Sequence, residues 1–260
     1  MKPAGNLRRL VRILATLLPD VRAIRRYDPD GGDTRAPDRL ARNLTALGPV
    51  FLKLGQILST RPDILPESYI KRLSELQEHA PEIDFTTIRR VVESELDAPL
   101  ETSFDNFERR PVAAASLAQV HKATLADGTT VAVKVQRPGL DALFRRDLDA
   151  LEFGLRLLRV LAPRRLRRTN LSAFISEFRR YSMGELDFQA EARVMERFRA
   201  NLSGQEGVRV PRTFPDHTTA CVLTMGWVEG MRLSETVATL SGSTQTKLVN
   251  RLVSMLLKMF

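Results

Sequence analysis

An alternating segment around Asp127-Gly128 limits what this chain can fold into more than any other feature of its sequence. In PVAAASLAQVHKATLADGTTVAVKVQRPG, apolar and polar residues alternate on both sides of that dipeptide, and Asp-Gly is a strong signal for a tight hairpin turn. The second strand places three valines on one face and Lys134 on the other. The two faces carry Val131, Val133 and Val135, and Ala132, Lys134 and Gln136. The sequence therefore predicts an antiparallel hairpin that bears a lysine.

Apolar residues at helical spacing dominate the rest of the chain. The expected helices are residues 6–26, 39–59, 67–78, 85–96, 140–161, 170–202 and 248–260. Further strands are expected at residues 208–211 and 220–225, a linker at 27–38, and turns at 61–66 and 163–168. The fold class is therefore α+β, with an antiparallel sheet and a majority of helix.

The composition favours anionic partners. Of 260 residues, 40 are Lys or Arg and 31 are Asp or Glu, which gives a net charge of +9 and a surface that attracts phosphate, nucleic acid or an anionic membrane. Nucleic acid is the weakest of these partners, because only 6% of residues are aromatic and no base-reading motif is present. Cys221 is the only cysteine, which fits a cytoplasmic protein without disulfides, and the three histidines are too scattered to predict a metal site.

Residues 6–26 form a basic amphipathic pattern with two open interpretations. Leucines and valines recur at helical spacing and six arginines surround them. Such a helix either lies on an anionic membrane surface or packs on its own domain with a solvated basic face. No apolar run approaches the ~20 residues of a membrane span, and no secretory cleavage site follows the short run at residues 13–19.

Lys134 and Glu191 are the first candidate functional pair. The string AVKV after a tight hairpin is similar to the V-A-I-K element of protein kinases, whose lysine holds nucleotide phosphates. In the expected helix 170–202, Asp187 and Glu191 are four residues apart and share a face, with Glu185 near in sequence. These carboxylates are either solvated or face a cation, and Lys134 is equally compatible with an edge strand that points it into water.

Two further features stand before the hairpin. In FLKLGQILS, Lys53 and Gln56 share a helical face, and Gly55 between them suggests close approach by another segment, although a chance glycine in an amphipathic helix fits too. The run Ala113, Ala114, Ala115 and Ser116 stands where kinases have a glycine-rich loop. Alanines leave less room for backbone to approach phosphates, so this run argues against a standard kinase.

Together these strings closely resemble the UbiB/AarF/ADCK family of atypical kinase-like proteins. KLGQ with STRPDILP resembles the family's K-x-G-Q signature and its continuation, and AAASLAQVHKATL resembles its alanine-rich loop. VAVKVQRPG is similar to its ATP-lysine strand, and ELDFQAEA to its E-x-D motif followed by the helix glutamate. The likeness runs from about residue 40 to the end of the sequence.

The resemblance implies a kinase-like small lobe with an N-terminal helical extension that folds over the nucleotide site. In that reading Lys134, paired with Glu191, holds the phosphates of ATP beneath the alanine run. Lys53 and Gln56 of the extension meet Glu185 and Asp187. The hinge that meets adenine would be Met225, Gly226, Trp227 and Val228.

The sequence departs from the family pattern in three places. Gly226 stands where the family usually has an acidic hinge residue, and RVM follows the helix EA where asparagine is common. We also expect the catalytic loop and the Mg²⁺ ligands of the complete family fold to lie beyond Phe260, together with the large lobe. The 260-residue chain is therefore expected to lack ATP turnover of its own, with no catalytic or metal-binding residue among those present.

Three functional hypotheses follow. The first is an ATP-binding kinase or ATPase that supports isoprenoid quinone or lipid metabolism, cytoplasmic and peripheral on the membrane through residues 6–26, with quinone-pathway lipids or proteins as partners. The second is an inactive pseudokinase that binds nucleotide or a partner, and the weakest is a nucleic-acid-binding module. The expected segments are a basic helix with its linker at 1–38, the helical extension at 39–110, the small lobe at 111–230 and the start of the large lobe at 231–260.

Overall fold

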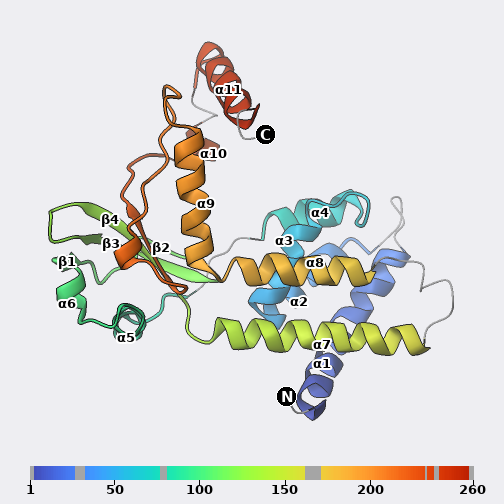
Figure 1. The fold of residues 1–260 in the computed structure, drawn as a ribbon. Coiled ribbons are helices and arrows are strands. Elements are labelled where there is room, and N and C mark those ends of the chain that lie inside the picture. The colour runs from blue at the N-terminus through green and yellow to red at the C-terminus, as the bar shows by residue number, and fades with distance from the viewer. Residues whose placement is uncertain are drawn as a thin grey trace. The chain divides into compact units, whose positions relative to one another are not determined.

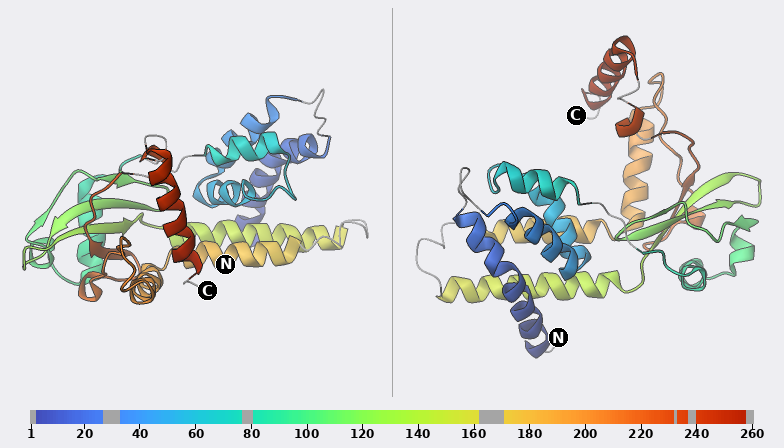
Figure 2. Two further views of the ribbon diagram at one scale, coloured as in Figure 1. Left: turned by 90° about the horizontal axis from the view of Figure 1, so that it is seen from above. Right: turned by 180° about the vertical axis from the view of Figure 1, so that it is seen from behind.

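The computed structural model describes residues 3–26, 33–76, 81–161, 171–231, 233–236 and 240–257. These residues form two compact units, and Figures 1 and 2 show the elements of each. The helical unit consists of the described residues within 1–80, 115–117 and 137–186, and the sheet unit of those within 81–114, 118–136 and 187–260. None of the described helices combines the length and the hydropathy that crossing a membrane requires.

The helical unit contains six helices within the described residues. They are α1 (Pro3–Arg25), α2 (Ala36–Leu47), α3 (Pro49–Leu58), α4 (Glu67–Ser74), α7 (Leu140–Leu161) and α8 (Leu171–Gly184). One apolar core joins them, and its fully buried members include Val50, Phe51, Phe144 and Leu148. The expected single helix over residues 39–59 is wrong. Gly48 adopts a φ of +109°, and Pro49 has no N–H to continue the hydrogen-bond ladder, so α2 ends and α3 begins there.

Buried charges join α1 to its neighbours. Asp147 of α7 is fully buried and accepts a 2.8 Å hydrogen bond from the Arg9 guanidinium. Asp20 of α1, also fully buried, accepts hydrogen bonds from Arg39 at 2.8 Å and Asn43 at 2.7 Å. Since a buried carboxylate without such partners would be costly, these contacts hold α1 in one position on the unit. The interpretation of residues 6–26 as a helix packed on its own domain is therefore correct for one face of α1.

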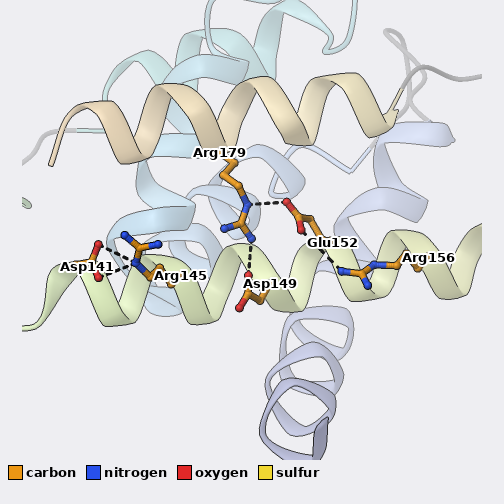
Figure 3. Close-up of polar contacts among 6 residues, drawn as sticks. All are labelled: Asp141, Arg145, Asp149, Glu152, Arg156 and Arg179. Atoms are coloured by element: carbon orange, nitrogen blue, oxygen red, sulfur yellow. Dashed lines mark hydrogen bonds and ion pairs between the residues drawn. The ribbon is translucent and has the colours of Figure 1, made fainter. Parts of the chain in front are cut away.

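Helices α7 and α8 run side by side, and an arginine joins them. Figure 3 shows Arg179 of α8 pointing between Asp149 and Glu152 of α7, one turn apart. Its guanidinium lies 2.6 Å from Asp149 Oδ1 and 2.6 Å from Glu152 Oε1. Because a planar guanidinium serves both carboxylates at once, the contact sets the register of the two helices. The expected turn at residues 163–168 lies outside the described residues.

The sheet unit contains the antiparallel sheet expected from the sequence. The five strands are β1 (Asn106–Phe107), β2 (Ala113–Ala114), β3 (Ala118–Thr124), β4 (Thr130–Gln136) and β5 (Val222–Gly226). Their order is β1-β3-β4-β5, and β2 also pairs with β3. Gly128 has a φ of +79° in the turn between β3 and β4, where an Asp-Gly pair was expected. The three valines of β4 are fully buried against Ile88 and Val92.

The remaining described elements of the sheet unit are helical. They are α5 (Phe85–Leu96), α6 (Leu100–Ser103), α9 (Phe188–Asn201), the 3-10 turn η2 (Pro215–His217), α10 (Leu233–Thr236) and α11 (Gly242–Leu257). The expected strand at residues 208–211 is wrong. In the described part of the chain that stretch pairs with no strand, and only Thr213 forms an isolated bridge, to Met225. Alternating apolar residues form a strand only where a neighbouring strand has unpaired backbone N–H and C=O groups with which they can form hydrogen bonds.

The expected helix over residues 170–202 is also wrong. α8 ends at Gly184 and α9 begins at Phe188. The Asp187 carboxylate accepts a hydrogen bond from the Ala190 N–H at 3.0 Å, and the Phe188 N–H donates to the Ala220 carbonyl at 3.0 Å. The first contact is an N-cap, and the second ties the start of α9 to the sheet.

Candidate nucleotide site

Lys134 and Glu191 form the pair that was expected from the sequence. The Lys134 ammonium nitrogen lies 2.9 Å from Oε1 and 2.7 Å from Oε2 of Glu191. It also lies 4.4 Å from the centroid of the Phe188 ring, so it is attracted by a carboxylate and by an aromatic face. The assignment of this pair to a nucleotide site stays a prediction.

The position of the pair follows from local structure in β4 and α9. Lys134 pairs across the sheet with Val120 of β3 and Leu223 of β5, so it stands on a central strand. Phe188 and Ala192 of α9 pack with Ala118 and Leu223 on that face of the sheet. This packing presents the first turn of α9, and thus Glu191, to the lysine.

Asp187 and Glu191 do not share a helical face as the sequence suggested. Asp187 is the N-cap of α9, outside the helix proper, and Glu191 lies in the first turn. Both positions favour a carboxylate, because the unpaired N–H groups at a helix start carry partial positive charge.

Lys53 meets a carboxylate within the helical unit. Its ammonium lies 2.7 Å from Glu185 Oε1 and 5.6 Å from the centroid of the Tyr181 ring. Gln56, one turn further along α3, makes no side-chain hydrogen bond to another described residue. Asp187 belongs to the sheet unit, where it caps α9. Within the helical unit the structure thus places Lys53 with Glu185, and the expected contact of Gln56 with Glu185 is not among the hydrogen bonds of the described residues.

Gly55 is a point of close approach, as its place in the helix suggested. A Cβ at this position would lie 2.9 Å from Leu76 Cδ1 and 3.0 Å from Leu44 Cδ1. Two leucines from other segments therefore occupy the space next to the glycine, which orients the face of α3 that carries Lys53.

The alanine run begins in β2 and leaves the sheet. Ala113 pairs with Val120 and Ala114 with Gln119. Beyond them, in the helical unit, the Ala115 carbonyl accepts a hydrogen bond from Arg137 Nε at 2.8 Å. Burial lowers the pKa of Arg137. Sequence reasoning missed Arg137, although its place directly after the strand of Lys134 was a usable signal.

The hinge expected at residues 225–228 is the end of β5 and the residues after it. Met225 pairs with Ala132, the Gly226 N–H donates to Arg212 O at 2.9 Å, and the Trp227 N–H donates to Thr130 O at 3.1 Å. These amides are already engaged. Val228, which is 46% exposed, follows them.

The family is decided by a sequence comparison. The profile of the ABC1 atypical kinase-like domain matches residues 75–260. This chain belongs to the ABC1 atypical kinase-like family. The resemblance drawn from the motifs is confirmed, and so is the kinase-like α+β fold.

Curated relatives of this ABC1 family chain are longer proteins. A Synechocystis protein, the uncharacterized protein sll0095, is 41% identical over 199 residues, which cover 75% of this chain and 35% of the relative. The chloroplastic protein ACTIVITY OF BC1 COMPLEX KINASE 8 of Arabidopsis thaliana is 41% identical over 197 residues, covering 75% of this chain and 26% of the relative. The chain thus spans about a quarter to a third of the length of these two ABC1 proteins.

A solved structure shares the fold. Rv3197 of Mycobacterium tuberculosis, determined in complex with erythromycin, is 28% identical with a TM-score of 0.58, covering 81% of this chain and 52% of that one. ATP and Mg²⁺ are general to kinase-like folds. The described residues of this ABC1 chain contain no cluster of three His, Cys, Asp or Glu side chains able to hold a metal ion.

Proposed function

We propose that this ABC1 family chain binds ATP as part of an atypical small-molecule kinase or ATPase. That enzyme would support isoprenoid quinone or lipid metabolism. The observation that carries the proposal is the ion pair of Lys134 and Glu191. A strand lysine oriented by a helix glutamate is the arrangement with which kinases position the phosphates of a nucleotide. The lysine reaches its carboxylate while its side chain is still 25% exposed, so it stays open to a phosphate.

The other residues of the proposed site have supporting roles. The alanine run would cover the phosphates, and the Val228 N–H would meet the adenine. The ion pair of Lys53 and Glu185 would stabilise the helical extension. The quinone or lipid substrate class rests on the family resemblance alone.

Nucleotide titration tests this proposal. A fluorescent ATP analogue should bind the wild-type chain saturably, and Lys134→Ala and Glu191→Gln should each weaken binding at least about tenfold, as expected for loss of a charge-assisted contact. Lys71→Ala, at an exposed lysine on α4, is the matched control and should bind as the wild type does. Equal affinity in all four proteins, or no binding by any of them, would contradict the proposal.

The alternative function is a catalytically inactive module that binds nucleotide or a partner. It is distinguished by following phosphate release and nucleotide binding on the same samples. Turnover that disappears in Lys134→Ala supports an enzyme, whereas saturable binding without turnover supports the inactive module.

A second function, attachment to an anionic membrane surface, is favoured by the outer face of α1. Its inner face is buried through Leu10 and Ile13. Five large apolar residues stay 43–57% exposed and recur at helical spacing along one stripe, and they are Leu7, Val11, Leu14, Leu18 and Val21. Exposed arginines lie beside that stripe, namely Arg8, Arg12, Arg22 and Arg26. An apolar stripe beside a basic one is what an interfacial helix presents to anionic lipid.

The liposome test must spare the inner face of α1. Deleting the helix would remove core residues, so the double variant Arg8→Gln/Arg12→Gln is preferable. Each arginine near an anionic surface contributes about 1 kcal/mol, so binding to phosphatidylserine vesicles should fall by roughly tenfold or more and weaken with added salt. Unchanged, salt-insensitive binding would show that these arginines do not attach α1 to the vesicles, and no binding by either protein would leave α1 with its packing role only.

A further inference from the structure

The sheet unit contains a hollow that the proposed nucleotide site does not use. It lies between the C-terminal half of α9 and the segment from Arg212 to His217, with a volume of about 450 Å³. This is the size range of small-ligand sites in proteins. The residues on which its chemistry depends are Glu196, Arg199, Arg212, Phe214 and Asp216.

Two contacts fix the position of Arg212 in this hollow. Its guanidinium carbon lies 4.3 Å from the centroid of the Phe214 ring, a close stacking contact. Its backbone is fixed because the Arg212 carbonyl accepts the Gly226 N–H at 2.9 Å. Its side chain is exposed. Its charge contributes, after the hydrogen bonds of Thr129, to the lowered pKa of the Asp127 carboxyl. A guanidinium that is already oriented loses less conformational entropy when it binds an anion.

Glu196 and Arg199 of the lining form an ion pair, so their charges offset one another. Its Oε1 accepts from the Thr213 N–H at 2.7 Å and from the Thr213 hydroxyl at 3.0 Å. Its Oε2 accepts from Arg199 Nε at 2.7 Å. Both oxygens are therefore engaged, while the terminal nitrogens of Arg199 keep donors to offer. Asp216, an exposed carboxylate, is the second lining carboxylate and opposes an anion.

We propose that this hollow binds a ligand in which a phosphate or carboxylate group is joined to an apolar body. The anionic group meets the guanidinium groups of Arg212 and Arg199, whose forked donors match such oxygens. The apolar body lies against Phe214 and Pro215. The site is separate from Lys134 and does not depend on the proposed binding of ATP.

Phenyl phosphate is the probe that tests this site. Calorimetric titration of the whole chain should show saturable binding, with phenol and inorganic phosphate each much weaker because each supplies half of the required chemistry. Arg212→Gln should weaken binding at least about tenfold. Asp216→Asn should strengthen it, since it removes the opposing charge. Arg209→Gln is the matched control, because Arg209 is an exposed arginine of the same stretch that does not line the hollow.

Lys134→Ala separates this site from the nucleotide site, because phenyl phosphate should bind it as it binds the wild type. Equal losses in Arg209→Gln and Arg212→Gln would show a diffuse charge effect and overturn the proposal, as would absence of binding or loss of binding in Lys134→Ala. A short peptide carrying phosphotyrosine identifies the source of the ligand. Tighter binding of the peptide than of phenyl phosphate indicates a protein partner, and equal binding indicates a small molecule.

Discussion

Lys134 of β4 and Glu191 of α9 form an ion pair that stays partly open to water, with side chains 25% and 38% exposed. This exposure decides how much the pair contributes to folding. A fully buried pair broken on one side costs about 3–5 kcal/mol, whereas exposed pairs contribute about 0.2–1 kcal/mol because water solvates both partners. The pair is therefore suited to binding more than to stability.

The first prediction follows from that exposure. Glu191→Gln should lower the melting temperature by no more than a few degrees, roughly what 1 kcal/mol produces in a chain of this size, while nucleotide affinity falls by the larger factor given above. Differential scanning calorimetry beside nucleotide titration checks both values. A large thermal loss with unchanged affinity would make the pair a structural one.

The second prediction concerns Lys53 and Glu185, which are less exposed at 16% and 24%. Glu185 Oε2 is buried without a hydrogen-bond partner among the described residues, so Lys53 compensates most of its charge. Lys53→Met should therefore destabilise the helical unit by about 1–3 kcal/mol. Adding Glu185→Gln should restore part of that loss, because the uncompensated carboxylate is gone. Urea unfolding followed by circular dichroism provides the double-mutant cycle, and strictly additive losses would show that the two side chains do not interact.

The third prediction is a pH dependence that arises from His121. Its ring is fully buried, with Nδ1 2.8 Å from the Glu108 carbonyl and Nε2 3.0 Å from the Gln119 side chain. Burial lowers the pKa of His121, while the Glu108 carbonyl and the carboxylates of Glu82 and Glu108 act in the opposite sense.

Because the folded pKa lies below the unfolded one, the unfolded chain takes up a proton first as the pH falls. Stability is therefore complete above about pH 6.5 and declines below it, by at most about 1.4 kcal/mol per pH unit, until the folded pKa is reached. Trp227, the only tryptophan, lies in the sheet unit and reports its unfolding in urea. The decline should be smaller in His121→Gln, and an identical pH profile in that variant would assign the effect to other groups.

The fourth prediction weighs two effects at Gly55. Alanine should gain about 1 kcal/mol of helix propensity, but its methyl group would press on the ends of Leu44 and Leu76, both flexible side chains. Gly55→Ala should therefore stay within about 1 kcal/mol of the wild type, while Gly55→Val should lose about 2 kcal/mol or more because its extra methyl groups overpack the contact. Equal stability of both variants in urea would mean that the leucines leave more space than the structure shows.

Local sequence signals determined much of this protein. The Asp-Gly turn, the three valines of β4 and the bounds of α5 and α7 could be predicted, because a turn dipeptide and an apolar period act within a few residues. The motif strings also indicated the family and brought Lys134 and Glu191 together as a predicted pair. Pro49 should have divided the helix expected over residues 39–59, since proline is a local signal too.

The tertiary structure alone decided the rest. Apolar periodicity runs through residues 185–187, and Asp187 is acceptable both inside a helix and as an N-cap. The hydrogen bond from Phe188 to Ala220, 32 positions later, ends that ambiguity by tying the start of α9 to the sheet. In the same way residues 208–211 have the alternation of a strand but pair with no described strand. The contact between Arg212 and the Phe214 ring depends on the hydrogen bond between the Arg212 backbone and β5. Contacts between residues distant in sequence depend on which backbone and side-chain groups the folded chain brings close together. The periodicity of a local segment carries no information about those partners.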